Sequence, residues 1–157
     1  MSTRASIETG WIGLQEWGLR RLDSLAARRG PAMAPHLTTG LRGERAALFH
    51  LRRLGYTIVA RRWTSAKMRG DVDLIGWEGD WLCFVEVKTR TVRDMTPAES
   101  AVDKDKQEML RRLARAYLRA FPEEKRRQIP VRFDVVSVYL LESGAEFEVF
   151  RGAFQWR

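Results

Sequence analysis

The sequence predicts an α/β domain in which a mixed central β-sheet is flanked by helices. Two observations predict this class. Apolar residues recur at helical spacing in two segments, and five other segments have the β-branched and aromatic content of strands. One expected helix lies between two expected strands, an order that implies a crossover connection between parallel strands. A very short link elsewhere implies an antiparallel hairpin, so both kinds of pairing are expected in one sheet.

Two helices are expected. The first covers residues 42–54, where apolar side chains recur at spacings of three and four and Gly55 provides a stop signal. The second begins at Thr96, which serves as N-cap, with a proline at the first helical position and Glu99 completing a capping box. Its apolar face continues to about Phe121.

The expected strands are 56–63, 71–78, 81–88, 131–141 and 147–150. Gly79-Asp80 joins the second strand to the third, and a Gly-X pair between two strands is typical of a two-residue type II′ turn. That turn sets the register, which places Asp73 opposite Glu86 and Asp71 opposite Lys88 on one face of the sheet. The rest of this face is apolar, so the charges gather at one end of it.

Opposed carboxylates at Asp73 and Glu86 would repel each other by roughly 3 kcal/mol at about 5 Å and an effective dielectric constant near 20. A divalent cation such as Mg²⁺ or Mn²⁺ would offset this repulsion, because both ions prefer oxygen ligands. Lys88 would then hold or deprotonate an attacking water, or neutralise charge on a phosphate. Two alternatives need no metal: a proton shared between the two acids, which raises one pKa, or an ordinary solvated face.

Composition favours a nucleic-acid partner. The chain of 157 residues carries a formal net charge of +8 and a pI of about 10.4, so its surface attracts polyanions. We expect no membrane segment and no signal peptide, and therefore a cytoplasmic protein. The single cysteine, Cys83, excludes an internal disulfide and a cysteine-based zinc cluster.

Residues 1–40 differ from the rest of the chain, because glycine, proline and paired arginines punctuate them. We expect an N-terminal arm that is loosely attached or partly helical, with a short helix near 16–27, followed by the domain at 41–157. Within the domain, Trp77 and Trp81 are expected in the core. Asp134 either orients a cleft residue or faces water.

Several motifs occur in an order that is far more specific than any one of them. They are Gly43-Glu44 with Ala47, Leu51-x-x-Leu54-Gly55-Tyr56, Gly70-Asp71-Val72-Asp73-Leu74-Ile75, Phe84-Val85-Glu86-Val87-Lys88-x-Arg90, Val102-x-x-x-Lys106-Gln107 and Arg132-Phe133-Asp134-Val135-Val136. In this combination the sequence resembles the YraN family over about 41–154. That family is similar to Holliday-junction resolvases and has the restriction-endonuclease-like fold of the PD-(D/E)xK class.

The resemblance implies hydrolysis of DNA phosphodiester bonds with Mg²⁺ or Mn²⁺. Asp73 and Glu86 would be metal ligands, Lys88 the catalytic lysine, and Glu44 the acid that completes the metal site in related resolvases. Glu44 also has a simpler explanation, because a glutamate near a helix N-terminus is favoured by the helix dipole. Val72 stands in place of the proline in the class name, and Asp71 where the family usually has glutamate.

The nucleic-acid contacts expected are Arg90, Lys106, Lys67, Arg69 and, by stacking on a base, Trp63. For Lys106 a solvated helix face is the favoured explanation. No recognition helix is visible, so binding should depend on phosphates and DNA shape. We expect a structure-selective endonuclease that acts on DNA. By resemblance to resolvases, branched DNA is the expected substrate and a homodimer the expected assembly. The alternatives are a catalytically inactive nucleic-acid-binding module and an adaptor that docks through its arginine-rich arm.

Overall fold

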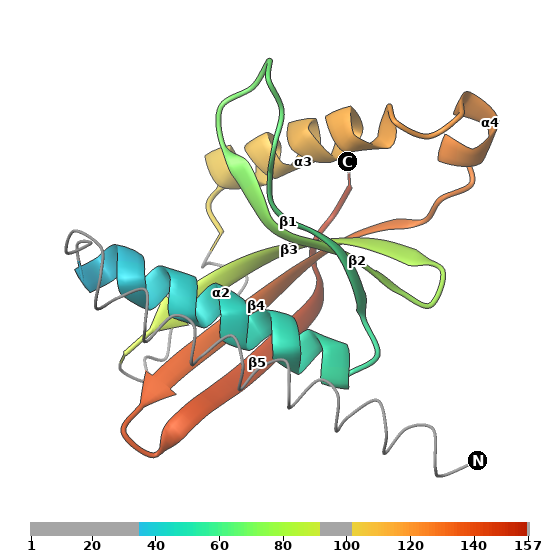
Figure 1. Ribbon diagram of the computed structural model, residues 1–157. Coiled ribbons are helices and arrows are strands. Elements are labelled where there is room, and N and C mark those ends of the chain that lie inside the picture. The colour runs from blue at the N-terminus through green and yellow to red at the C-terminus, as the bar shows by residue number, and fades with distance from the viewer. Residues whose placement is uncertain (1–34, 92–101, 157) are drawn as a thin grey trace, which may run out of the picture.

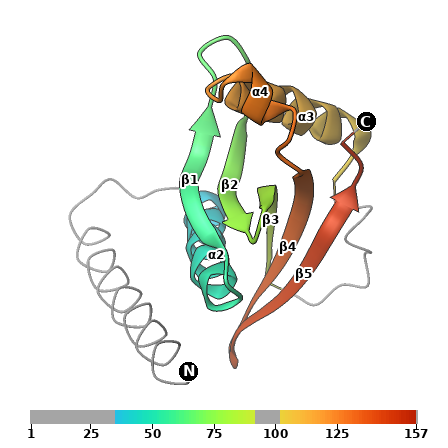
Figure 2. The same ribbon diagram turned by 90° about the vertical axis from the view of Figure 1, so that its right-hand side faces the viewer.

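A computed structural model describes residues 35–91 and 102–156. They form a five-stranded sheet in the order β1-β2-β3-β4-β5 (Figures 1 and 2). Its elements are α2 (Pro35–Arg53), β1 (Thr57–Thr64), β2 (Asp71–Glu78), β3 (Trp81–Arg90), α3 (Lys104–Leu118), α4 (Glu123–Arg126), β4 (Val131–Leu141) and β5 (Gly144–Phe154). The predicted α/β class is confirmed. Within the described ranges, no helix is long and apolar enough to cross a membrane.

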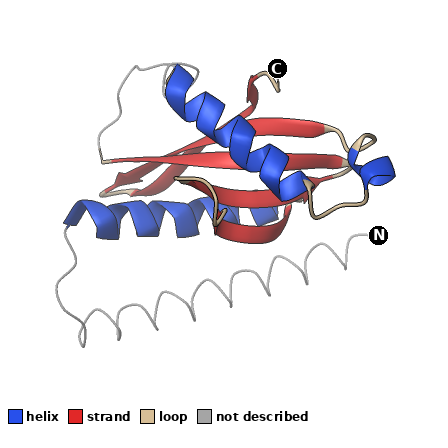
Figure 3. Cartoon of the chain, turned by 90° about the horizontal axis from the view of Figure 1, so that it is seen from above, coloured by secondary structure: helices blue, strands red, loops and turns tan. Residues whose placement is uncertain are grey.

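The sheet is mixed, as predicted. β3 and β4 pair in parallel, whereas β1 with β2, β2 with β3 and β4 with β5 pair antiparallel. α3 and α4 lie in the connection between the two parallel strands. Figure 3 shows α2 on one face of the sheet and α3 on the other. Both faces are therefore covered, which explains why the central strands are apolar on both sides.

Each helix buries its own hydrophobic cluster against the sheet. Buried residues on the α2 side include Ala47, Phe49, Leu51, Leu74, Cys83, Val85, Val136 and Val138. Buried residues on the α3 side include Leu110, Leu113, Leu118, Ile75, Leu82, Phe84, Phe133 and Val135. Consecutive strand residues fall into different clusters, because side chains alternate between the two faces of a strand. By this alternation Glu86, two residues after Phe84, lies on the α3 side.

Both helices begin at other residues than predicted. α2 starts at Pro35 rather than residue 42 and runs through Gly40, which does not interrupt it. Gly55 adopts a positive φ of 96° just beyond its end, as expected for a stop residue. α3 starts at Lys104, where the side chain of Asp103 accepts a hydrogen bond from the backbone N–H of Lys106. The capping box predicted at Thr96 lies outside the described residues.

The β2–β3 hairpin has the predicted turn and register. Gly79 at the first turn position has a φ of 57°, and the paired residues run from Glu78 with Trp81 to Leu74 with Val85. The prediction of a buried Trp81 is wrong, because its side chain is 44% exposed. Trp77 does pack against the α3-side cluster, as predicted.

Two glycines of α2 differ in what a methyl group would meet. A Cβ on Gly43 would lie 1.8 Å from Oγ1 of Thr89, so the helix sits almost directly on β3 there. A Cβ on Gly40 would have no atom of the described residues within 4 Å. We expect Gly43→Ala to lower the free energy of unfolding by about 1–3 kcal/mol through overpacking. Gly40→Ala should raise it by up to about 1 kcal/mol, because alanine favours helix. Urea unfolding of both variants tests this, and equal effects would contradict it.

Candidate active site

The strands β2 and β3 separate just where the predicted acidic residues lie. Their pairing ends at Leu74 with Val85, and beyond it Oδ2 of Asp73 accepts a hydrogen bond of 2.7 Å from the backbone N–H of Val87. A side chain thus takes the place of a backbone acceptor. The carboxylate of Asp73 is thereby held against β3, next to Glu86.

The predicted opposition of Asp71 and Lys88 is wrong for the same reason. The side chain of Asp73 accepts the hydrogen bond of the Val87 amide, so the backbone pairing of β2 with β3 does not continue beyond Leu74 and Val85. Asp71 pairs with Thr64 of β1 instead, and its Oδ2 lies 3.7 Å from Nε of Arg62. Lys88 stays on the same side of β3 as Glu86, because the two are two residues apart.

Glu86 is the most enclosed acid of this region, with an exposed fraction of 4%. Its Oε1 lies 3.0 Å from Nζ of Lys88, and its Oε2 lies 3.0 Å from Nζ of Lys106. A buried carboxylate requires such compensation, because removing a charge from water costs several kcal/mol. Lys106 therefore does not lie on a solvated helix face: it reaches from α3 to the acid on β3.

The carboxyl of Asp73 has a raised pKa. Burial, followed by the negative charges of Glu86 and Glu44, raises the pKa of the Asp73 carboxyl to about 7, although the N–H of Val87 and the charge of Lys106 oppose the rise. Near neutral pH the carboxyl is thus poised to take up a proton or a metal ion. A shared proton, one of the two metal-free alternatives, agrees with this environment as well.

This environment predicts a pH dependence of the metal-free protein. The pKa of Asp73 is about 7 in the folded chain against an ordinary value of 3.8, so the folded state binds this proton more tightly. The resulting stabilisation is complete below the ordinary pKa and disappears as the pH rises through about 7. In EDTA, the free energy of unfolding of wild type should fall between about pH 4 and pH 7 relative to that of Asp73→Asn. Parallel curves for the two proteins would contradict the assignment.

Glu44 lies on α2, and its side chain is 17% exposed. Burial raises its pKa, with Arg62 acting against the rise. Glu44 influences Asp73 through its charge, yet no three His, Cys, Asp or Glu side chains of the described residues gather closely enough to hold one metal ion. The structure therefore brings together two carboxylates and two lysines, with the predicted third acid outside that group.

Arg62 is a residue that sequence reasoning missed. Its φ of 45° makes it the one non-glycine residue with a positive φ in the described part of the chain. Its Nε lies 3.9 Å from Oε2 of Glu44 and 3.7 Å from Oδ2 of Asp71, so the guanidinium stands between acids of two different elements. Strained backbone of this kind often occurs at functional sites. Nothing in the local sequence announces a left-handed residue within a strand.

The backbone strain at Arg62 can be measured against its neighbour Arg61, which is also exposed on β1. Glycine raises the entropy of the unfolded chain equally at both positions, but only at 62 does it relieve a left-handed conformation. We expect Arg62→Gly to be more stable than Arg61→Gly by about 1 kcal/mol. Chemical denaturation of the pair tests this. A less stable Arg62→Gly would mean that its ion pairs outweigh the strain.

The remaining predicted contacts lie in β1, in the loop after it and at the end of β3. Lys67 and Arg69 are exposed in the loop between β1 and β2. Arg90, at the end of β3, lines a cavity of about 430 Å³ together with Glu44 and Val87. The ring of Trp63 makes an edge contact with Tyr117 at 5.3 Å and packs against the α3-side cluster. The structure thus gives Trp63 a packing role in the core.

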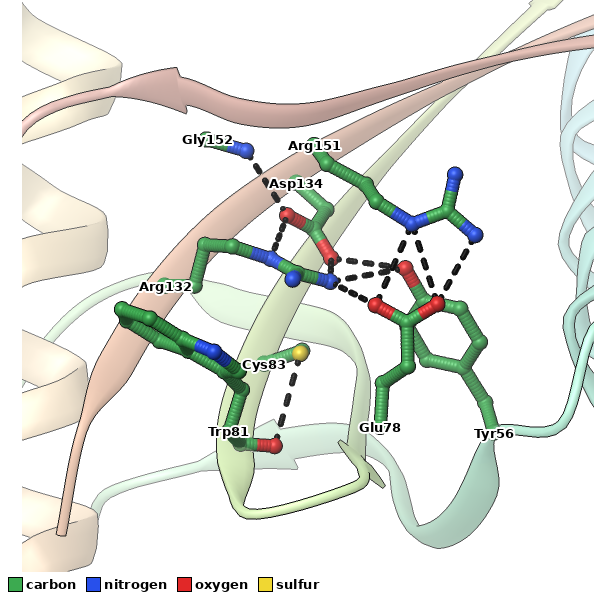
Figure 4. Close-up of polar contacts among 8 residues, drawn as sticks. All are labelled: Tyr56, Glu78, Trp81, Cys83, Arg132, Asp134, Arg151 and Gly152. Atoms are coloured by element: carbon green, nitrogen blue, oxygen red, sulfur yellow. Dashed lines mark hydrogen bonds and ion pairs between the residues drawn. The ribbon is translucent and has the colours of Figure 1, made fainter.

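A second polar cluster lies near the β2–β3 turn and includes Glu78 and Asp134 (Figure 4). Asp134 is 1% exposed and accepts hydrogen bonds from the hydroxyl of Tyr56, the guanidinium of Arg132 and the backbone N–H of Gly152. The contacts with Tyr56 and Gly152 join β4 to other parts of the fold, and the contact with Arg132 lies within β4. Asp134 therefore neither faces water nor belongs to the centre around Asp73.

Glu78 completes this cluster at the surface. It receives hydrogen bonds from Arg151 and Arg132, and the bonds from Arg151 hold the pKa of the Glu78 carboxyl at about 2, with Arg132 adding to the effect. The guanidinium of Arg132 also lies over the ring of Trp81, 5.8 Å from its centroid. The exposed Trp81 is thus held by a cation–π contact rather than by the core.

Comparison with known proteins identifies the family. Residues 43–138 match Uncharacterised protein family UPF0102. A UPF0102 protein of Koribacter versatilis is 46% identical over 142 residues, which cover 87% of this chain and 96% of that protein. One of Solibacter usitatus is 42% identical over 135 residues, covering 86% and 96%. One of Rhodococcus opacus is 47% identical over 109 residues, covering 69% and 87%.

The matched range contains Glu44, Asp73, Glu86, Lys88 and Lys106, and hence the whole candidate centre. Its extent also agrees with the motifs from which the sequence resembles the YraN family. The chain belongs to the uncharacterised protein family UPF0102, which is the YraN family.

Proposed function

We propose that this protein is a metal-dependent nuclease that hydrolyses phosphodiester bonds in DNA at the centre formed by Asp73, Glu86 and Lys88. One observation carries the proposal: where the strands separate, Asp73 of β2 lies next to the enclosed Glu86 and Lys88 of β3, and the pKa of the Asp73 carboxyl is raised. Such perturbed acids are typical of functional sites.

The donor set suits a hard divalent cation. Mg²⁺ is commonly bound through one or two carboxylates together with water and substrate phosphates, so a third carboxylate is not required. Oε2 of Glu86 has one polar contact among the described residues, the ion pair of 3.0 Å with Nζ of Lys106. Asp73 and Glu86 would therefore hold the ion, and Glu44 would act on it only through its charge.

A bound Mg²⁺ or Mn²⁺ would supply an acidified water and stabilise negative charge on the phosphate. The protein itself contributes orientation. The N–H of Val87 fixes the carboxylate of Asp73, and Glu86 holds the ammonium of Lys88 at 3.0 Å. From that position Lys88 would orient the attacking water or neutralise the phosphate as charge develops on it.

DNA is the proposed substrate because of the charge of the chain, +8 overall. α2 and α3 each use one face to pack on the sheet, and we expect recognition to rest on phosphates and shape. Arg90, Lys67 and Arg69 are the proposed phosphate contacts. A branched substrate with two-fold symmetry would suit a homodimer, which sedimentation with junction DNA would detect.

The test is cleavage of junction, flap and single-stranded DNA with Mg²⁺, Mn²⁺ or EDTA. Wild type should cut at least one substrate in a metal-dependent manner, and Lys88→Ala should retain binding but lose cutting. One observation favours a second candidate, an inactive DNA-binding module: the two lysines already neutralise Glu86 without any metal. Binding without cleavage under all of these conditions would establish that candidate instead.

A further inference from the structure

Lys106 has a fixed backbone but a side chain directed away from its own helix. It lies in the first turn of α3, where its backbone N–H donates a hydrogen bond of 2.8 Å to Oδ1 of Asp103. The next residue, Gln107, donates from Nε2 to the carbonyl oxygen of Val102 at 2.9 Å. These contacts anchor the beginning of α3, and from it the ammonium of Lys106 reaches Glu86 on β3.

Helix stability does not account for this lysine. The N-terminal end of a helix carries a partial positive charge, so a cation in the first turn is disfavoured by about 0.3–1 kcal/mol. Ordering a long lysine side chain adds an entropic cost. The favourable interaction that offsets both is the contact with Glu86, whose carboxylate would otherwise lie buried beside Asp73 with Lys88 as its one cation.

The contact on Oε2 has the properties of one that can be exchanged. Nζ of Lys106 lies 3.0 Å from Oε2, and no other hydrogen-bond partner of this oxygen lies in the described part of the chain. Oε2 therefore depends on one contact, and its second lone pair has no donor among these residues. The side chain of Lys106 is 26% exposed, so the ammonium has a path to solvent. A divalent cation approaching Oε2 would compete with this one contact.

We propose that Lys106 is an internal counter-ion of Glu86 that a divalent metal must displace. It compensates the acidic centre in the metal-free protein and lowers the metal affinity of that state. The displaced ammonium remains beside the centre, within reach of a phosphate of the substrate. This role rests on the proposed metal-dependent function and assigns to Lys106 a part distinct from that of Lys88.

The experiment measures Mn²⁺ binding and thermal stability of the full chain in four forms: wild type, Lys106→Gln, Lys106→Arg and Lys104→Gln. Lys104 is an exposed lysine at the start of the same helix and gives a charge-matched control. Lys106→Gln should bind Mn²⁺ about tenfold more tightly than wild type, a change of about 1.4 kcal/mol. In EDTA it should melt at a lower temperature than Lys104→Gln. Lys106→Arg, which keeps the charge, should resemble wild type in both measurements.

The possible results separate this inference from the proposed function. If wild type binds Mn²⁺ and Lys106→Gln binds it equally or more weakly, Lys106 is no competitor and the inference fails while the metal site stands. If only Lys106→Gln binds Mn²⁺, displacement is supported. Absence of Mn²⁺ binding in both proteins overturns the metal site and the inference together. Circular dichroism of each variant establishes that the folds are equal before binding is compared.

Discussion

Replacement of Asp73 by asparagine is expected to lower the rate of DNA cleavage by roughly a thousandfold or more, about 4 kcal/mol in activation free energy. Asparagine keeps the size of the side chain, and its amide oxygen can still accept the hydrogen bond from the N–H of Val87. It lacks the charge that would bind a divalent cation. The fold should therefore survive while the chemistry is lost, and single-turnover cleavage at saturating metal measures the effect.

DNA binding gives this variant its internal control. Removing a negative charge from a surface that binds phosphate should leave affinity unchanged or slightly improve it. Asp105→Asn removes one charge from an exposed position of α3 and should cleave like wild type. Cleavage by Asp73→Asn within a few-fold of wild type would rule out Asp73 as a metal ligand.

Replacement of Asp134 by alanine is expected to cost about 3–5 kcal/mol of unfolding free energy, because it removes one partner of a buried ion pair. Its side chain is fully buried, and Arg132 would lose the acceptor that lies 2.7 Å from its Nε. Tyr56 and the N–H of Gly152 would lose their acceptor too. For a chain of this size the melting temperature should fall by about 10 °C or more.

The removal of a single contact provides the comparison. Tyr56→Phe deletes the hydroxyl that donates to Asp134 but leaves the charge of Asp134 paired with Arg132. It should cost only about 1 kcal/mol. Calorimetry of the two variants separates a cooperative network from independent bonds. A loss below about 1 kcal/mol in Asp134→Ala would show that the cluster contributes little to stability.

The strands of this fold are well encoded locally. Both β2 and β4 have the predicted bounds, because their apolar runs end at turn or proline signals that lie directly next to them in the chain. The register of the β2–β3 hairpin follows from Gly79 alone, since a two-residue turn leaves no other pairing. Where one neighbouring residue decides the outcome, the sequence suffices.

Features that depend on residues distant in the chain were harder to predict from the sequence. α3 begins at Lys104 with Asp103 as its N-cap, a position that the sequence analysis did not single out. The prediction correctly grouped Asp73, Glu86 and Lys88 by alternation, but not Lys106, which arrives from an element distant in the chain. The prediction also missed the hydrogen bond from the Val87 amide to the Asp73 side chain, which separates Asp71 from Lys88. No periodic sequence pattern marks a side chain that accepts a hydrogen bond from the backbone of another strand.

Because the amide of Val87 donates its hydrogen bond to Asp73, the NMR signal of this amide reports on the acidic centre. Its acceptor is the very carboxylate whose charge changes when a proton or cation arrives, so the chemical shift of this amide and its solvent exchange should follow occupancy. An ¹⁵N-labelled sample would therefore reveal the state of the centre without any substrate. A titration followed at the Val87 amide would therefore give the pKa of Asp73 in EDTA and the metal affinity of the centre when a divalent cation is added.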